Sequence, residues 1–105
     1  MDFTGKKVLV VGLARSGMAA IKVLKSLGAE VTLSESKKKE DIKDAAILED
    51  MGVTITDQSP EVFEGNYDLC VKNPGVPYRS PAMARLAERN IPVITEIELA
   101  YQVSK

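Results

Sequence analysis

The sequence predicts a three-layer α/β fold, in which a parallel sheet of five strands lies between two layers of helices. Short apolar runs alternate with amphipathic segments along the whole chain. This alternation is typical of parallel strands joined by right-handed helical crossovers. The chain has 105 residues, of which 45% are hydrophobic, and that is enough for one compact core. We therefore expect residues 1–105 to form a single domain.

Five apolar runs are the predicted strands. Residues 7–12 form a nearly continuous apolar run that ends on a glycine, as expected for a strand buried on both faces. The other strands are expected at residues 30–33, 53–55, 67–71 and 91–94. We expect the sheet order 3-2-1-4-5, which places a topological switch point between strands one and four.

Four segments carry helix signals. The first covers residues 15–28 and ends at Gly28, a suitable residue for the position after a helix. The second covers residues 41–51. Ser80 caps the third, with Pro81 at its first position, and Thr95 with Glu98 forms a capping box that opens the fourth. The apolar residues expected to face inward are Ala20, Val23, Leu24 and Leu27 in the first helix, Ile47, Leu48 and Met51 in the second, Met83, Leu86 and Ala87 in the third, and Ile97, Ala100 and Tyr101 in the fourth.

The composition argues against several functional classes. The net charge is -1, which gives no sign of nucleic acid or an anionic membrane as a partner. No apolar stretch approaches the roughly 20 residues that span a bilayer. The chain has no histidine and a single cysteine, Cys70, so we expect no metal site, no disulfide and a cytoplasmic location. We expect Cys70 to lie in the core. We expect no catalytic residue in the chain, because its composition favours binding over chemistry.

A glycine-rich turn follows the first strand and opens the first helix, as in Rossmann-like folds. Its glycines permit a tight turn and close packing of helix on strand, and the N–H groups at a helix start attract phosphate. We expect a diphosphate to bind here, although a plain turn that binds nothing is the alternative. Ala14 replaces the middle glycine of the dinucleotide fingerprint, which argues mildly against NAD. The residues of the turn are Gly12, Leu13, Ala14, Arg15, Ser16 and Gly17.

Glu35 follows the second strand, about 20 residues beyond the glycines, where dinucleotide-binding folds place an acid that bonds ribose hydroxyls. It could instead contact a base or be a solvated loop acid. Ser36 adds a short hydrogen-bonding group, and Lys37 adds a cation within a lysine run that is more often simply solvated.

A loop rich in turn residues follows the fourth strand, at residues 73–77. With the expected strand order, this loop and the glycine turn border the same crevice. Asn73 and Gly75 are the candidate site residues here, because Gly75 would let a ligand approach the backbone. The alternative is a turn that the prolines only make rigid.

Three segments together resemble the first domain of the bacterial UDP-N-acetylmuramoyl-alanine–D-glutamate ligases, the MurD family. They are residues 7–17, residues 73–77, which are similar to that family's Ser/Asn-Pro-Gly-Ile/Val segment, and residues 95–99, which are similar to the segment before its domain boundary. The likeness covers essentially the whole chain, with the three segments in the same order.

The resemblance implies a role in a cytoplasmic, ATP-dependent ligase that joins D-glutamate to UDP-N-acetylmuramoyl-L-alanine during peptidoglycan synthesis. It implies that this domain holds the UDP moiety and binds no cofactor itself, while ATP and Mg²⁺ belong to the full-length enzyme. We expect the chain alone to be monomeric and inactive as a ligase. The implied contacts are Arg15 and Ser16 at the diphosphate and ribose, Glu35, Ser36 and Lys37 around the uracil, and Gly75 against the nucleotide.

Two departures and two alternatives accompany this resemblance. Glu35 stands where many relatives have Asp, and Arg15 replaces a residue that is often smaller or apolar.

The first alternative is an NAD-binding domain of a dehydrogenase or regulatory protein, which shares the fold and Glu35. The second is a receiver-like or protein-interaction module, but the chain lacks the acids that a receiver needs after strand one.

Overall fold

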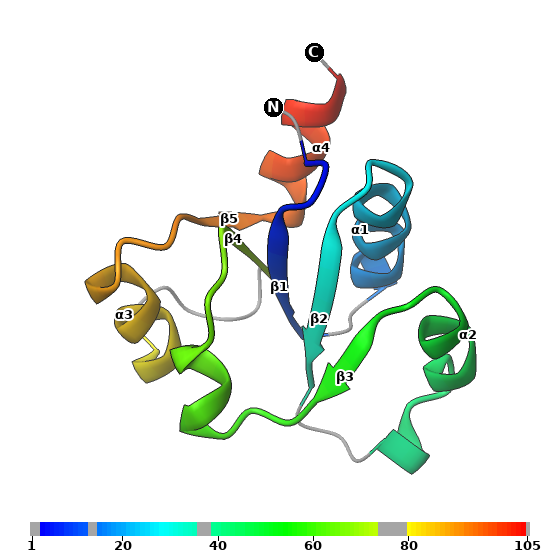
Figure 1. Cartoon of the computed structure of the whole chain (residues 1–105), viewed down its shortest axis with the longest axis horizontal. Helices are drawn as coiled ribbons and strands as arrows, with labels where there is room; N and C mark the ends of the chain where they lie inside the picture. The colour runs from blue at the N-terminus through cyan, green and yellow to red at the C-terminus, as the bar shows by residue number, and fades with distance from the viewer. Residues whose placement is uncertain (1–2, 13–14, 36–38, 74–79, 105) are drawn as a thin grey trace.

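The computed structural model describes residues 3–12, 15–35, 39–73 and 80–104, with the backbone alone at 15–17, 39 and 102–104. Its centre is a parallel sheet of five strands in the order β3-β2-β1-β4-β5 (Figure 1). The strands are β1 Lys7–Val11, β2 Glu30–Ser34, β3 Thr54–Thr56, β4 Leu69–Lys72 and β5 Val93–Thr95. The predicted fold class and strand order are therefore confirmed. The observed strand ends differ slightly from the predicted ones, and Lys72 is the last residue of β4.

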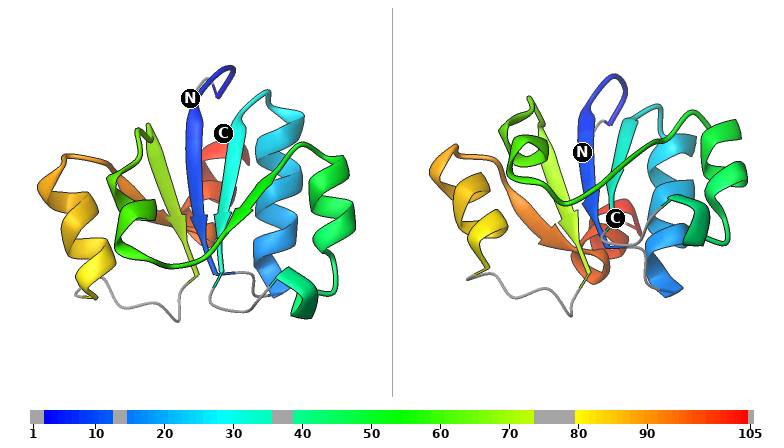
Figure 2. Two further views of the ribbon diagram at one scale, coloured as in Figure 1. Left: turned by 60° about the horizontal axis from the view of Figure 1, so that its bottom comes forward. Right: turned by 90° about the horizontal axis from the view of Figure 1, so that it is seen from below.

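Helices cover both faces of the sheet (Figure 2). They are α1 Arg15–Ser26, α2 Ala45–Asp50, α3 Pro81–Glu88 and α4 Glu96–Ser104, with short 3-10 segments η1 Lys39–Asp41 and η2 Pro60–Glu64. Side chains alternate along β1, so Val8 and Val10 join a core with α1, α2 and α4. Leu9 and Val11 join a smaller core beneath η2 and α3.

Three helices end in the same way at the amino edge of the sheet. The second residue after each helix, Gly28, Gly52 or Asn90, has a positive φ. The next residue donates its N–H to the carbonyl of a leucine five positions earlier, as Ala29 does to Leu24 at 3.1 Å. This is the Schellman ending, which satisfies the last carbonyls of a helix. The stop predicted at Gly28 is thus observed.

The caps of the last two helices also follow the prediction. The Met83 N–H donates to the Ser80 hydroxyl at 3.4 Å. At α4, the Thr95 N–H donates to the Glu98 carboxylate at 3.1 Å, and the Glu98 N–H donates to the Thr95 hydroxyl at 3.2 Å. The capping box therefore fixes where α4 begins.

The predicted inward faces are right only in part for the first three helices. Ala20 and Leu24 are buried in α1, but Leu27 is 37% exposed because the chain turns away there, and Ile21 is buried instead. Helix α2 begins at Ala45 rather than at residue 41. Its short length brings Leu48 into the core and leaves Ile47 52% exposed.

The inward face predicted for α4 is wrong, and that of α3 needs one correction. In α3, Met83 and Leu86 are buried, whereas Ala87 is exposed. In α4, Ile97 and Tyr101 are exposed, as is Ala100, and the core contact is made by Leu99. The helix starts directly after β5, so Leu99 meets the α1 side of the core and the opposite stripe faces outward.

Candidate functional site

The end of β1 meets the ends of β2 and β4 at the carboxyl edge of the sheet. The Gly12 N–H donates to the Ser34 carbonyl at 2.9 Å, and the Asn73 N–H donates to the Val11 carbonyl at 3.1 Å. Gly12 has a φ of +85°, and a Cβ added there would lie 3.4 Å from the Asn73 Cβ. The glycine turn and the loop after β4 therefore begin side by side, as the strand order requires.

The first helix starts where a phosphate-binding helix would start. Arg15, Ser16 and Gly17 form the first turn of α1, which contains no acidic residue. The N–H groups and the dipole at a helix N-terminus favour an anion beyond this end. Of the other predicted site residues, Leu13, Ala14, Ser36, Lys37 and Gly75 lie outside the described residues.

Glu35 is held at the edge rather than placed in solvent. It is only 8% exposed, so the interpretation as a solvated loop acid is wrong. Its N–H donates to the Thr56 carbonyl at 3.0 Å, and the preceding Ser34 hydroxyl donates to the Asp57 carbonyl at 2.8 Å. These bonds tie the end of β2 to the exit of β3 and fix the position at which Glu35 leaves the sheet.

Two buried charged residues at this edge were not predicted as site residues. Lys72, the last residue of β4, is 3% exposed, and Glu96, directly after β5, is 6% exposed. Lys72 is in register with Val11 on one side and with Thr95 on the other. Together with Glu35, they are the buried charged residues of the described chain. They gather at the carboxyl edge of the sheet, where folds of this kind bind their ligands, so this edge is the candidate functional site.

A weak sequence signal for Lys72 existed. A lysine that ends an otherwise apolar strand, directly before a loop of turn residues, occupies the position where strands of this fold contact ligands. In the sequence, an acid at residue 96 is accounted for by the dipole of the helix that it opens. That explanation suits Glu98, which is exposed and caps the helix, but it does not account for the burial of Glu96.

A cavity of about 470 Å³ opens beside this edge, between η2 and α3. Val11 borders it at the end of β1, and its walls include Pro60, Phe63, Pro81 and Met83. Its volume lies within the range of small-molecule pockets. This cavity could not be predicted from the sequence, because its walls come from segments far apart in the chain.

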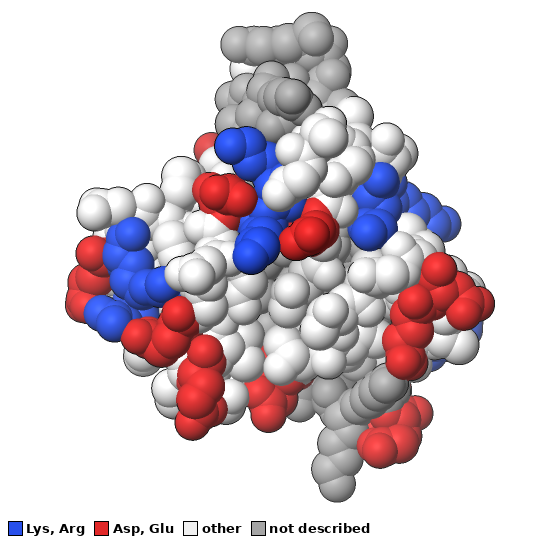
Figure 3. Space-filling model, in the orientation of Figure 1, with Lys and Arg blue, Asp and Glu red and all other residues white. Residues whose placement is uncertain are grey.

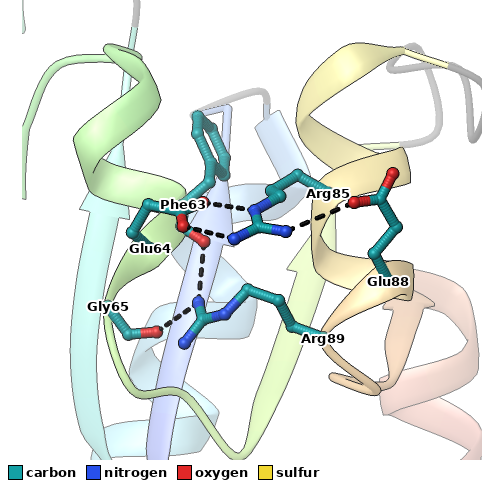
Figure 4. A network of polar contacts seen from close by, with 6 residues as sticks. All are labelled: Phe63, Glu64, Gly65, Arg85, Glu88 and Arg89. Atoms are coloured by element: carbon teal, nitrogen blue, oxygen red, sulfur yellow. Dashed lines mark hydrogen bonds and ion pairs between the residues drawn. The ribbon is translucent and has the colours of Figure 1, made fainter.

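Arg85 of α3 and Arg89, directly after that helix, hold η2 in place beside the cavity (Figure 4). Two nitrogens of Arg85 each lie 2.6 Å from a carboxylate oxygen of Glu64. Arg89 donates to the Phe63 and Gly65 carbonyls at 2.8 and 2.7 Å. The hydrogen bond from Arg85 lowers the pKa of Glu64 below its usual value.

The surface charges of the described residues are mixed in sign. Figure 3 shows lysines and arginines interspersed with aspartates and glutamates near α3 and η2. No helix among these residues combines the length and apolarity needed to cross a membrane.

The family model and the curated relatives that match this chain belong to the same family. Residues 6–95 match the family model of the Mur ligase MurD-like N-terminal domain. The chain is 48% identical over 105 residues to the UDP-N-acetylmuramoylalanine–D-glutamate ligase of Lactococcus lactis subsp. lactis (strain IL1403), covering 98% of this chain. It is 43% identical over 102 residues to the ligase of the same name from Geobacillus sp. (strain WCH70), covering 95% of this chain. It spans 23% of the length of each of these curated relatives.

Solved structures agree on the fold. The UDP-N-acetylmuramate-alanine ligase MurC of Thermotoga maritima superimposes with a TM-score of 0.71 at 22% identity, over 93% of this chain and 22% of that one. The A chain of Bacillus subtilis dipicolinate synthase gives a TM-score of 0.64 at 16% identity, over 90% of this chain and 38% of that one. At these identities the likeness shows the fold alone. The sequence matches show the family, and the chain belongs to the MurD-like N-terminal domains of the Mur ligases.

Proposed function

We propose that this domain binds the UDP moiety of UDP-N-acetylmuramoyl-L-alanine. It would do so as the first domain of an ATP-dependent ligase that adds D-glutamate during peptidoglycan synthesis in the cytoplasm. The observation that carries the proposal is the carboxyl edge, where a glycine turn opens α1 beside three buried charged residues. Family membership supports the same ligand, because the curated relatives are named for a UDP-linked substrate.

The edge offers complementary groups for each part of UDP. The N-terminus of α1 suits the diphosphate, and the ammonium of Lys72 adds positive charge at the end of the neighbouring strand. Glu35 offers a carboxylate that accepts hydrogen bonds from a ribose hydroxyl or from the N–H of uracil. We assign no catalytic residue to this chain, and ATP with Mg²⁺ would bind to the other parts of the longer enzyme.

An NMR titration of the chain tests this proposal. UDP and UDP-N-acetylmuramoyl-L-alanine should shift the amide signals of residues 12–17, 35, 72, 73 and 75, while those of the Schellman endings stay in place. The methyl and ring signals of Met83 and Phe63 would report whether the ligand extends into the cavity. Unmoved amides at residues 12–17 would refute UDP binding at this edge. Shifts with NADH, but none with UDP, would favour the dehydrogenase-type alternative instead.

Glu35→Gln gives a sharper test of the base or ribose contact. The amide keeps the size of the side chain but removes an acceptor and the charge, so the affinity for UDP should fall about tenfold, as expected for a lost hydrogen bond to a charged group. Glu30→Gln, at the other end of the same strand, is the matched control and should leave the affinity unchanged.

A further inference from the structure

A polar pocket of about 390 Å³ opens at the amino edge of the sheet. It is separate from the carboxyl edge, because β1 runs between the two edges from Lys7 to Val11, roughly 13 Å. The pocket is large enough for a small metabolite. Its walls come from three segments of the chain, and the lining residues are Lys7, Asn66, Tyr67, Asp68, Arg89 and Ile91.

Hydrogen bonds hold the polar walls of this pocket in place. The Lys7 N–H donates to the Asp68 carboxylate at 2.9 Å, and the Asp68 N–H donates to the Lys7 carbonyl at 2.7 Å. The Tyr67 hydroxyl donates to the Val62 carbonyl at 2.8 Å. Arg89 is held by the two carbonyls of the η2 segment to which it donates. A group that is already fixed loses little conformational entropy when a ligand binds, so the pocket is organised in advance.

Arg89 keeps hydrogen-bond donors for a ligand. Its bonds to Phe63 and Gly65 both leave from Nη1, and Figure 4 shows the other terminal nitrogen on the side away from the Phe63 carbonyl. Within the described part of the chain, Nε and Nη2 donate no hydrogen bond. These two nitrogens form the edge of a guanidinium that binds both oxygens of a carboxylate.

Three charged side chains line this pocket without being paired. Lys7 lies on the same face of β1 as Leu9, which is buried beneath η2 and α3. In the described part of the chain, neither Lys7, Asp68 nor Arg89 forms an ion pair. The pocket therefore presents two cations and one anion that a ligand can neutralise.

This arrangement complements the charges of an acidic amino acid. Arg89 and Lys7 match its two carboxylates, and Asp68 matches its ammonium. Tyr67 is half-buried and Ile91 is buried, so they offer apolar surface to the carbon chain that joins these groups. We propose that the pocket binds a free dicarboxylic amino acid, for which glutamate is the probe.

A simple anion fits the same pocket less well. The carboxylate of Asp68 would repel it, and no group of the anion would replace the water lost from Asp68. An amino acid with a single carboxylate would in turn leave one of the two cations unmatched. The inference does not depend on UDP binding, because no residue of this pocket belongs to the carboxyl edge.

An NMR titration of the chain with glutamate tests the proposal. The amide signals of residues 7, 66–68 and 89–91 should shift and saturate, while those of residues 12–17 and 35 stay in place. UDP should give the opposite pattern, so either site can fail without the other. The D and L enantiomers are titrated separately, and saturable binding of either one supports the proposal.

Two analogues resolve the charges of the ligand. Glutarate lacks the ammonium, and alanine lacks the second carboxylate. Each should bind about fivefold more weakly than glutamate, as expected for the loss of one solvent-exposed ion pair.

The variant Asp68→Asn gives a sharper test. Its amide oxygen still accepts the Lys7 N–H, but the negative charge is gone. The affinity for glutamate should fall about fivefold, while the affinity for glutarate should not fall. Lys7→Gln should also weaken glutamate binding. Lys6→Gln is its matched control, because Lys6 is adjacent and exposed but does not line the pocket, and it should have no effect.

Three results would overturn the proposal. The first is an absence of saturable shifts at residues 66–68 and 89–91 with millimolar glutamate. The second is glutarate binding as tight as glutamate binding, which would make the pocket a site for simple anions. The third is a loss of glutamate binding that is equal for Lys7→Gln and Lys6→Gln, which would mean that the ligand responds only to the overall charge of this edge.

Discussion

The two edges of the sheet bury different kinds of residue. At the amino edge, the last turns of α1, α2 and α3 contain Leu24, Leu48 and Leu86, all fully buried, and the carbonyl of each accepts a Schellman hydrogen bond. At the carboxyl edge, the buried side chains include those of Ser34, Glu35, Lys72 and Glu96. Apolar burial of the first kind stabilises the fold, whereas burial of charge costs stability unless the charge is paired. We therefore propose that the amino edge maintains the fold and that the carboxyl edge binds the nucleotide.

The largest expected effect is at the amino edge. Leu24→Ala removes a fully buried side chain from the end of α1 and should lower the free energy of unfolding by about 2–5 kcal/mol. Urea denaturation measures the loss. The UDP affinity of the folded protein should stay the same. Leu27→Ala, in the same helix end but 37% exposed, is the control and should cost much less. A large change in affinity for Leu24→Ala would show that the two edges are not separate.

Lys72→Met tests the carboxyl edge. The variant keeps an apolar chain of similar length and removes the buried ammonium at the end of β4. The affinity for UDP should fall about tenfold to a hundredfold, which corresponds to the ~1.5–3 kcal/mol of a hydrogen bond to a charged group. Calorimetric titration with UDP and with uridine separates the two roles of this lysine. Uridine lacks phosphate, so its affinity should not change.

The control for this variant lies at the opposite edge. Lys25→Met changes the same residue type in the last turn of α1 and should leave both affinities as they are. An equal loss for UDP and uridine with Lys72→Met would mean that Lys72 supports the fold and does not meet the diphosphate.

A pair of glycines allows the most direct comparison of the edges. Gly12 and Gly28 both have a φ of +85°, and a Cβ at either would lie 3.4 Å from its nearest neighbour, Asn73 or Thr4. Either glycine replaced by alanine should cost about 1–2 kcal/mol, because a side chain is strained at positive φ. Only Gly12→Ala should also weaken UDP binding. If both variants bind UDP equally well, the glycine turn is not a phosphate site.

Short-range sequence patterns explain why the strand order and the helix ends could be predicted correctly. The strand order follows from alternating patterns and crossover handedness. The caps at Ser80 and Thr95 and the stop at Gly28 each depend on a few neighbouring residues. From these local features alone, Gly12 and Asn73 can be placed at the same edge of the sheet, its carboxyl edge.

Long-range packing explains what the sequence missed. The face of α4 that reaches the core depends on how the helix meets α1, and the apolar pattern of residues 97–101 gave no warning that Ile97 and Tyr101 face outward. Lys72 and Glu96 look like ordinary surface residues in the sequence, and only the assembled sheet shows their burial. Ala14 and Gly75 lie outside the described residues, so the contacts predicted for them stay predictions.

The smallest expected effect concerns Cys70, in the middle of strand β4. Cys70 lies two positions before Lys72 and is fully buried, and burial raises the pKa of its thiol from 9.0 to about 12. Below pH 9 both the folded and the unfolded chain keep the proton, so stability is complete. Above it only the unfolded thiol ionises, so stability should fall by about 1.4 kcal/mol for each pH unit, until the folded thiol also titrates.

Cys70→Val isolates this contribution, because it replaces the buried thiol by an apolar side chain that does not ionise. Urea denaturation at pH 8 and pH 10 should show a smaller loss of stability in the variant, by about 1 kcal/mol. Equal losses would mean that the middle of β4 accepts a charge as readily as its end does. The burial of Lys72 would then be a general property of this strand, and it would no longer distinguish the carboxyl edge as a binding site.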